Sequence, residues 1–261
     1  MKTSRTALIT GATSGIGLEL ANLFAKDGIN LALVSRNKTD LEKIKLTFEK
    51  LYNISVFIYP TDLAKTDAAQ QVYETMTNNG IEIEYLVNNA GFGDYTEFSE
   101  SDAGKNYDMM MLNMVTLTEL THLFLANMKE NKAGKILNVA SIAAFQPGPL
   151  MAVYYATKAF VLSFSEAISE ELKGSGVTVT VLCPGPTTTK FQKEANLGKS
   201  KLFKSSLVMD AQIVAQIGYD GMNQEKVIVI PGFSNWLFSI LVRFIPRSLT
   251  RKLIMRVQKE G

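Results

Sequence analysis

The sequence predicts an α/β fold: a doubly wound parallel β-sheet of about seven strands, covered by helices on both faces and followed by a C-terminal helical extension. Short apolar runs with little polar alternation recur along the chain, as in strands buried on both faces. Amphipathic segments separate these runs at short spacing, which is typical of parallel sheets. The first run leads into a glycine-rich turn that opens a helix. Since no repeat or linker interrupts the pattern, we expect residues 1–261 to form one domain.

The composition excludes several classes of function. Of the 261 residues, 46% are hydrophobic and 20% charged, and the net charge of +2 gives no reason to expect nucleic acid as a partner. The one cysteine, Cys183, excludes an internal disulfide, and the one histidine, His122, excludes zinc sites rich in His or Cys. The residues before Thr6 lead directly into a short strand-like run, too short for a signal-peptide core. We therefore expect a cytoplasmic protein without a metal.

The first predicted strand, Thr6 to Thr10, runs into a turn of glycine and small residues. The turn reads Gly11-Ala12-Thr13-Ser14-Gly15-Ile16-Gly17, and helical periodicity then continues to Asp27. In a Rossmann-type fold such a turn lets the backbone close tightly, and the helix N-terminus offers free N–H groups to a pyrophosphate. The spacing Gly-x-x-x-Gly-x-Gly differs from the usual dinucleotide fingerprint, so a purely structural turn is the alternative.

The second predicted strand, Asn30 to Val34, ends at Ser35 and Arg36. In dinucleotide-binding folds the end of this strand meets the adenosine ribose, and an acidic residue there would bind the 2′-hydroxyl of NAD. A guanidinium instead pairs with a phosphate, through a charge-assisted hydrogen bond of roughly 1.5–3 kcal/mol. Arg36 therefore favours NADP(H) over NAD(H). The alternative is a solvated arginine at a strand end.

The remaining strands and helices alternate along the chain. The predicted strands are residues 55–59, 85–87, 135–140, 178–183 and 226–230, and the predicted helices are residues 39–53, 66–79, 101–128 and 152–173. Loops after these strands carry Asp62 with Leu63, Asn88-Asn89-Ala90-Gly91, and Pro184-Gly185-Pro186. Because open α/β sheets bind ligands at that edge, we expect the loops to surround a ligand. Asp62 could equally cap a loop, and the turn Asn88-Asn89-Ala90-Gly91 could be structural.

Tyr154 and Lys158 lie near the start of the predicted helix 152–173. The spacing Tyr-x-x-x-Lys places a phenol and an ammonium one turn apart on one helix face. A phenol with a pKa near 10 exchanges protons poorly at neutral pH, and we expect Lys158, with a bound cationic ring, to lower that pKa. Tyr154 is therefore a candidate general acid and base. The alternative is a tyrosine on a buried helix face with a lysine at the rim.

In their order and spacing, these motifs resemble the classical short-chain dehydrogenase/reductase family. The matching set is Thr10-Gly11-x-x-x-Gly15-x-Gly17, Asn88-Asn89-Ala90-Gly91, Asn113, Ser141, Tyr154-x-x-x-Lys158 and Pro184-Gly185. Ser141 precedes Tyr154 by thirteen residues, as the catalytic serine of that family does. Each motif is weak alone, but the ordered set is specific, and it covers the chain to about residue 232.

The resemblance implies a role for each matching residue. Tyr154 looks like the catalytic acid and base, Ser141 like the donor to the substrate oxygen, and Lys158 like the residue that holds the nicotinamide ribose. Asn113 resembles the asparagine that keeps a helix locally open and anchors a water. The predicted cofactor contacts are Gly11, Thr13, Ser14, Gly15, Ile16, Gly17, Ser35, Arg36, Asp62, Leu63, Asn89, Ala90, Gly91, Tyr154, Lys158, Pro184, Gly185, Thr187 and Thr189.

The reaction that the resemblance implies is hydride transfer between a nicotinamide and a carbonyl or secondary alcohol, with NADP(H) as cofactor and reduction as the expected direction. Residues 187–208 are expected to form a mobile lid, whose Phe191, Leu202 and Phe203 favour an apolar substrate of the ketoacyl or hydroxysteroid kind. A lid that packs on its own protein would explain these residues equally well. The alternative function is a non-catalytic NADP(H)-binding redox sensor or scaffold, against which the intact catalytic set argues.

Residues 233–261 form the predicted helical extension. The apolar stretch Phe233 to Ile245 is far shorter than the roughly 20 residues that span a bilayer. Arg243, Arg247 and Arg251 follow at four-residue intervals. We expect a helical hairpin that packs on a partner subunit of a homodimer or homotetramer, or covers the substrate pocket, with its arginines solvated. The less favoured alternative is a helix on an anionic membrane surface.

Overall fold

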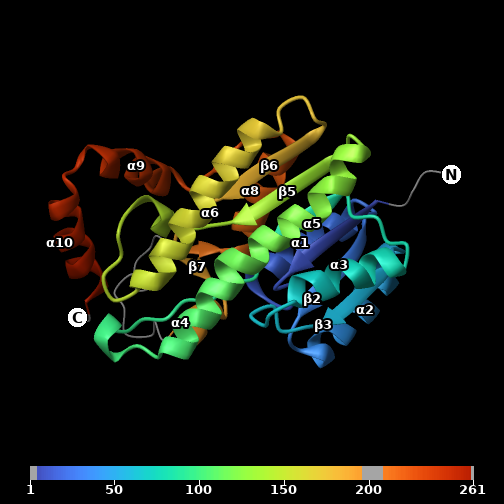
Figure 1. Ribbon diagram of the computed structural model, residues 1–261, viewed down its shortest axis with the longest axis horizontal. Coiled ribbons are helices and arrows are strands. Elements are labelled where there is room, and N and C mark those ends of the chain that lie inside the picture. The colour runs from blue at the N-terminus through green and yellow to red at the C-terminus, as the bar shows by residue number, and fades with distance from the viewer. Residues whose placement is uncertain (1–4, 196–207, 260–261) are drawn as a thin grey trace.

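The computed structural model describes residues 5–195 and 208–259. Its centre is a seven-stranded parallel sheet in the order β3-β2-β1-β4-β5-β6-β9 (Figure 1). Every predicted strand is present, within two residues of its expected bounds. The observed strands are β1 (Thr6–Thr10), β2 (Asn30–Ser35), β3 (Val56–Pro60), β4 (Tyr85–Asn88), β5 (Gly134–Val139), β6 (Val177–Leu182) and β9 (Ile228–Val229).

Helices cover both faces of the sheet, as predicted. One face carries α1 (Gly15–Lys26), α2 (Lys38–Tyr52) and α8 (Ala211–Asn223), and the other carries α3 (Ala68–Asn78), α5 (Leu117–Glu130) and α6 (Ala152–Glu171). The two apolar clusters that form the core lie between these layers. The strand order reverses between β1 and β4, which places a ligand-binding crevice beside those two strands. The helix α8 lies in a stretch for which the sequence predicted no element.

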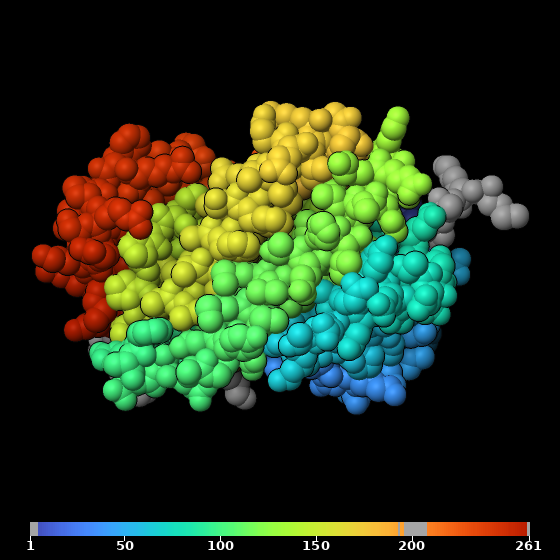
Figure 2. Space-filling view, viewed as in Figure 1, coloured from blue at the N-terminus to red at the C-terminus, as the bar shows by residue number. Residues whose placement is uncertain are grey.

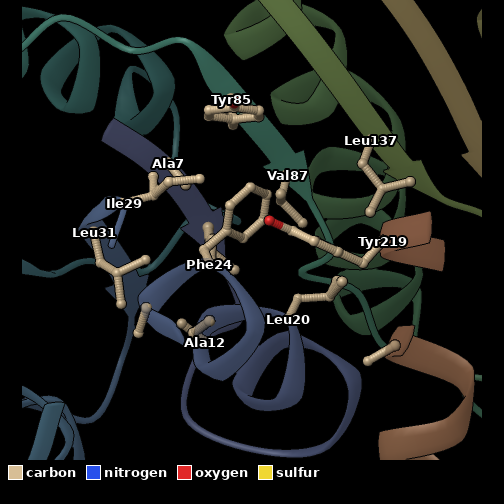
Figure 3. Packing of buried hydrophobic residues seen from close by; sticks show 14 of the residues in the cluster. Ala7, Ala12, Leu20, Phe24, Ile29, Leu31, Tyr85, Val87, Leu137 and Tyr219 are labelled. Atoms are coloured by element: carbon tan, nitrogen blue, oxygen red, sulfur yellow. The ribbon is translucent and has the colours of Figure 1, made fainter. Parts of the chain in front are cut away.

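An aromatic cluster fixes α1, the helix that follows the glycine turn, to its neighbours. Phe24 on α1 packs between Tyr85 and Tyr219, with ring centroids 5.1 and 4.9 Å away, as Figure 3 shows. The Tyr219 hydroxyl donates a hydrogen bond of 2.6 Å to Asp27 Oδ2 just after α1. Because α1 is held from β4 and α8 at once, the turn at its N-terminus is a rigid part of the fold.

The predicted helix 101–128 is interrupted. It consists of α4 (Ala103–Met110), a π-helical segment (Met111–Thr116) and α5, and together they run from Ala103 to Glu130. By length and apolar composition this stretch could also cross a membrane. In the structure, however, Leu120, Phe124 and Met128 are buried against the sheet and α3. It therefore serves as a core helix of this domain.

The lid and the extension lie after β6. The described part of the predicted lid has β7 (Thr187–Thr188), which pairs with β8 (Met209–Asp210), and the short α7 (Phe191–Glu194). The predicted lid residues Leu202 and Phe203 lie outside the described residues. The extension forms α9 (Phe233–Leu241), a 3₁₀ turn (Val242–Phe244) and α10 (Arg247–Gln258), a hairpin at one end of the molecule (Figure 1).

Candidate active site

A cleft of about 650 Å³ opens where the sheet's strand order reverses. Most of the predicted site residues line it, although they come from the segments after six separate strands and from the helix α6. They are Gly11, Thr13, Ser14, Gly15, Ile16, Ser35, Arg36, Asp62, Leu63, Asn89, Ala90, Gly91, Ser141, Tyr154, Lys158, Pro184, Gly185, Thr187 and Thr189. Two predicted residues, Gly17 and Asn113, do not line the cleft and lie behind its wall.

The glycines of the β1–α1 turn are required by its backbone and by its close packing. Gly11 and Gly15 have φ angles of +65° and +55°, in the left-handed region that favours glycine. A Cβ at Gly15 would lie 2.8 Å from the Thr189 methyl group. A Cβ at Gly17 would lie 2.5 Å from the Gly11 carbonyl oxygen, so this position is closely packed against the turn itself.

Asn89 holds this turn from the neighbouring strand. Its side-chain amide donates to the carbonyl oxygens of Thr10 (2.9 Å) and Gly11 (3.2 Å), and the Thr10 hydroxyl accepts from the backbone N–H groups of Asn89 and Ala90, both at 3.0 Å. Both N–H bonds of the Asn89 amide are thus used within the protein. The amide N–H groups of Asn89 therefore have a structural role, which was the alternative for the Asn-Asn-Ala-Gly motif. Its side-chain carbonyl oxygen is the atom left for a ligand.

The end of β2 forms one side of the cleft. The Ser35 and Thr13 hydroxyls lie 3.0 Å apart in a hydrogen bond that joins β2 to the glycine turn. Arg36 is exposed at the rim and forms no ion pair with any described residue. Asp62 has both properties that the sequence left open: its carboxylate accepts from the Ala64 N–H at 3.1 Å, as a loop cap does, and it lines the cleft.

Asn113 lies in the π-helical segment, which agrees with the expectation of a locally open helix. The side chain is buried and accepts from the Phe92 N–H (3.2 Å), while its amide donates to the Phe92 carbonyl (3.0 Å) and to the Thr157 hydroxyl (3.1 Å). A Cβ at Gly91 would lie 2.9 Å from Asn113 Oδ1 and 3.4 Å from Lys158 Nζ. Asn113 therefore joins the loop after β4 to α6 directly behind Lys158.

Lys158 is buried in the cleft wall. Its ammonium donates to the Val139 carbonyl at 2.8 Å and lies 5.8 Å from the centroid of the Tyr154 ring. Burial lowers the pKa of Lys158 to about 8, because the charged form loses its water. Lys158 is therefore not a solvated lysine at the rim of the fold, which was the alternative that the sequence left open.

The Ser141 hydroxyl lies within reach of the Tyr154 hydroxyl, and it also accepts from the Ala143 N–H at 3.1 Å and donates to the Pro184 carbonyl at 3.4 Å. Burial raises the pKa of Tyr154 above its ordinary value, and the bond from Ser141 opposes this shift without cancelling it. The expected lowering of the Tyr154 pKa was for Lys158 together with a bound cationic ring, and in the protein without that ring desolvation raises the pKa instead. In the protein alone the phenol is protonated at neutral pH.

An apolar wall packs around the Tyr154 ring, and the sequence pointed to only one of its members. The Phe191 ring packs against the Tyr154 ring at 5.3 Å, and Met151, Tyr155 and Ala195 complete the cluster. The other cleft residues that the sequence analysis missed include Phe92, Lys105, Asp108, Leu112 and Ile142. The only sequence signal for these residues is that they follow a strand or begin a helix. That signal does not distinguish residues of a site from residues that only pack in the fold.

The C-terminal helix reaches this wall. The Gln258 amide on α10 donates to the Tyr155 hydroxyl at 2.6 Å, and the Tyr95 hydroxyl donates to the Gln258 carbonyl at 2.5 Å. Gln258 is fully buried. No sequence signal indicated this contact, because a single glutamine near a chain end carries no pattern.

Known proteins are similar to this chain in sequence and in fold. The family profile described as short chain dehydrogenase matches residues 5–200. A very-long-chain 3-oxoacyl-CoA reductase of Anas platyrhynchos is 32% identical over 97% of this chain and 80% of its own. A 17-beta-hydroxysteroid dehydrogenase type 3 of Mus musculus is 34% identical over 73% of this chain and 62% of its own.

Among solved structures, the short-chain dehydrogenase from Sphingobium yanoikuyae in complex with NADPH has a TM-score of 0.83 and 28% identity, covering 92% of this chain and 94% of its own. The likeness in fold therefore extends over nearly the whole domain. With a matching profile over most of its length and a relative aligned along almost all of it, this chain belongs to the short-chain dehydrogenase family of oxidoreductases.

Proposed function

We propose that this oxidoreductase uses NADPH to reduce the ketone of an apolar substrate of the 3-oxoacyl or ketosteroid class. The observation that carries the proposal is the pairing of the Tyr154 and Ser141 hydroxyls opposite an apolar wall, with Lys158 buried beside them. Two hydroxyls at one point can both bind a single carbonyl oxygen. The apolar wall suits the hydrophobic body of such a substrate.

The geometry of the glycine turn supports a dinucleotide cofactor. The turn has no room for side chains at Gly11 and Gly15, so the backbone can approach a pyrophosphate, and α1 begins at Gly15 with its free N–H groups. Ser35 and Arg36 would hold the adenosine ribose and its phosphate, and Lys158 the other ribose. When bound, NADPH supplies the hydride.

The protein's own contribution is to position and protonate the substrate oxygen. The Ser141 hydroxyl orients that oxygen, and Tyr154, whose phenol is protonated at neutral pH, gives it a proton. Asn113 fixes the loop that carries Gly91 behind Lys158. Phe191 and Met151 exclude water from the reacting oxygen.

The relatives support the substrate class. Their names specify a 3-oxoacyl thioester and a hydroxysteroid, both of which present a ketone or secondary alcohol on a large apolar body. The test is the loss of NADPH absorbance with a panel of long-chain 3-oxoacyl thioesters, ketosteroids, sugars and aromatic aldehydes. The apolar ketones are expected to be the best substrates. Tight NADPH binding with no turnover of any of them would favour the redox sensor or scaffold instead.

Arg36 is expected to set the preference between the two dinucleotides. Replacing Arg36 with Asp should shift the ratio of NADPH to NADH efficiency about 10- to 100-fold towards NADH, because the guanidinium is free at the cleft rim and an aspartate repels the 2′-phosphate. The measurement is kcat/KM for both cofactors with one ketone. Lys43→Asp, on the exposed face of α2, is the control with the same charge change. An unchanged ratio in the Arg36 variant would contradict the assignment.

We also retain the predictions of a cytoplasmic location and of a homodimer or homotetramer. Tyr107 and Met110 on α4 and Phe160 on the neighbouring α6 are exposed apolar side chains that could form such a subunit contact. Light scattering of the purified protein over a range of concentrations measures the oligomeric state.

A further inference from the structure

The C-terminal hairpin has its apolar side turned outward. On α9 and the 3₁₀ turn after it, the exposed side chains are Phe233, Trp236, Leu237, Leu241 and Phe244, and the first and last of these are 74% and 80% exposed. The side of α9 that faces the protein is polar instead, with Asn235 and Ser239 buried and hydrogen-bonded to the backbone. An ordinary surface helix has the opposite arrangement.

Helix α10 continues this surface. Its inner stripe, Thr250, Ile254 and Gln258, is buried against the domain at four-residue spacing. Its outer side carries the exposed Leu249, Leu253 and Val257. Figure 2 shows the hairpin, in red, gathered at one end of the molecule beyond α6. The hairpin is thus packed on its own domain by one side and presents apolar side chains on the other.

The charge of the hairpin differs from that of the rest of the chain. Residues 233–261 contain six basic side chains and one acidic one, whereas residues 1–232 contain 21 basic and 24 acidic ones. The basic residues include Arg243, Arg247, Arg251, Lys252 and Arg256, all exposed and without an ion pair to any described residue. The net charge of +2 therefore hides an acidic body and a basic end.

We infer that this hairpin docks the enzyme on the surface of an anionic lipid bilayer. Aromatic and aliphatic side chains on one face with a rim of arginine and lysine are the features of a helix that lies in the interface of a membrane. The apolar face would enter the boundary between headgroups and acyl chains, and the cations would meet the lipid phosphates and carboxylates. Neither helix is long enough to span a bilayer, so the docking is peripheral.

A second copy of this chain is the less suitable occupant. In a two-fold dimer the same patch meets itself, which would bring two sets of unpaired cations together. That juxtaposition opposes association, whereas an anionic bilayer complements the charge. We therefore prefer the membrane surface to the partner subunit that the sequence favoured, although α10 does pack on the cleft wall through Gln258. The arginines are solvated, as expected, but the apolar face of α9 is solvated too.

The docking surface adjoins the cleft. Helix α9 packs on the 3₁₀ turn Ile142–Phe145 that follows Ser141, and α10 ends at Gln258 in contact with Tyr155 in the cleft wall. An enzyme docked by this hairpin would hold its apolar wall close to the bilayer, where an apolar ketone dissolves. This consequence depends on the proposed function, but the docking itself does not.

The experiment uses the only tryptophan of the chain, Trp236, which lies on the proposed docking face. The full-length protein is mixed with vesicles of phosphatidylcholine and phosphatidylserine, or of phosphatidylcholine alone, and is then floated on a density gradient. We expect flotation with the anionic vesicles, a blue shift of the tryptophan emission, and quenching of that emission by lipids brominated on their acyl chains. Absence of both flotation and quenching overturns the inference.

Two variants with matched controls separate the apolar and charged contributions. Phe244→Ser should lower vesicle binding by about tenfold or more, whereas Leu46→Ser, on an α2 side chain 69% exposed, should not. Arg247→Glu with Arg251→Glu should lower binding to anionic vesicles by at least about tenfold, whereas Lys43→Glu with Lys50→Glu, the same charge change on α2, should not.

A different result would identify a different occupant. If light scattering shows an oligomer that Phe244→Ser dissociates, and the vesicles bind nothing, then a second copy covers the hairpin and the inference is wrong. Loss of ketone reduction with intact vesicle binding would overturn the proposed function and leave the docking standing. If a variant fails to fold, the quenching of Trp236 in the unaltered protein still tests whether the hairpin enters the bilayer.

Discussion

Replacing Tyr154 with Phe is expected to lower kcat for ketone reduction by about 10²- to 10⁴-fold, the usual contribution of a positioned general acid. The variant removes only the hydroxyl and keeps the ring that packs against Phe191 at 5.3 Å. NADPH affinity should change little, because the glycine turn, Arg36 and Lys158 are untouched. Stopped-flow turnover and fluorescence titration of NADPH measure the two quantities separately.

The neighbouring residue provides a matched control. Tyr155 lies on the same helix and in the same cleft wall, but its hydroxyl bonds to Gln258 at 2.6 Å instead of facing Ser141. Tyr155→Phe should keep most of its turnover and lose about 1 kcal/mol or more of folding stability, the cost of a broken buried hydrogen bond. Near-normal turnover in Tyr154→Phe, or an equal loss in both variants, would remove Tyr154 from the proton-transfer step.

Replacing Lys158 with Met is expected to reduce activity and raise thermal stability together. Activity should fall about 100-fold or more, because the charge beside Tyr154 and the proposed ribose contact are both lost. Stability should rise at pH 7, because burial lowers the pKa of Lys158 from 10.5 to about 8 and the charged lysine therefore opposes folding by roughly 3 kcal/mol. Ketone reduction and thermal unfolding at pH 7 measure the two effects.

The stability difference between wild type and Lys158→Met should depend on pH in a defined direction. Below pH 8 the lysine is charged in both folded and unfolded chains, so the cost of burying that charge is fully present. Between pH 8 and 10.5 the unfolded chain binds the proton and the folded chain does not, so the stability of the wild type rises with pH relative to the variant. The exposed Lys129→Met should show neither change. A Lys158 variant that melts well below wild type at pH 7 would contradict this account.

The fold was predictable because each local signal agreed with the global one. The apolar runs of the buried strands, the glycine turn before α1 and the helical periodicity all depend on neighbours within a few residues. The positions of Ser141, Tyr154 and Lys158 were predictable for a further reason, since their order matches a known family. In a doubly wound sheet, residues at the ends of successive strands must meet at one edge.

The features that could not be predicted depend on distant contacts or on burial. Gln258 reaches Tyr155 across 103 positions of sequence, and nothing near either residue indicates the pair. The sequence suggested that Lys158 lowers the pKa of Tyr154, but the sign of that shift depends on how completely both groups lose water. The sequence also could not predict that the apolar face of α9 points outward. A periodic pattern identifies the apolar side of a helix but not whether that side meets a core or the solvent.

The contact of Gln258 with the cleft wall has a practical consequence for anyone who purifies or truncates this enzyme. Deleting the last turn of α10 would remove the hydrogen bonds that Gln258 makes with Tyr155 and Tyr95, the first of which lies in the cleft wall beside Tyr154. Only three residues would separate an affinity tag fused after Gly261 from Gln258. Affinity tags therefore belong at the N-terminus, which is far from this contact in sequence.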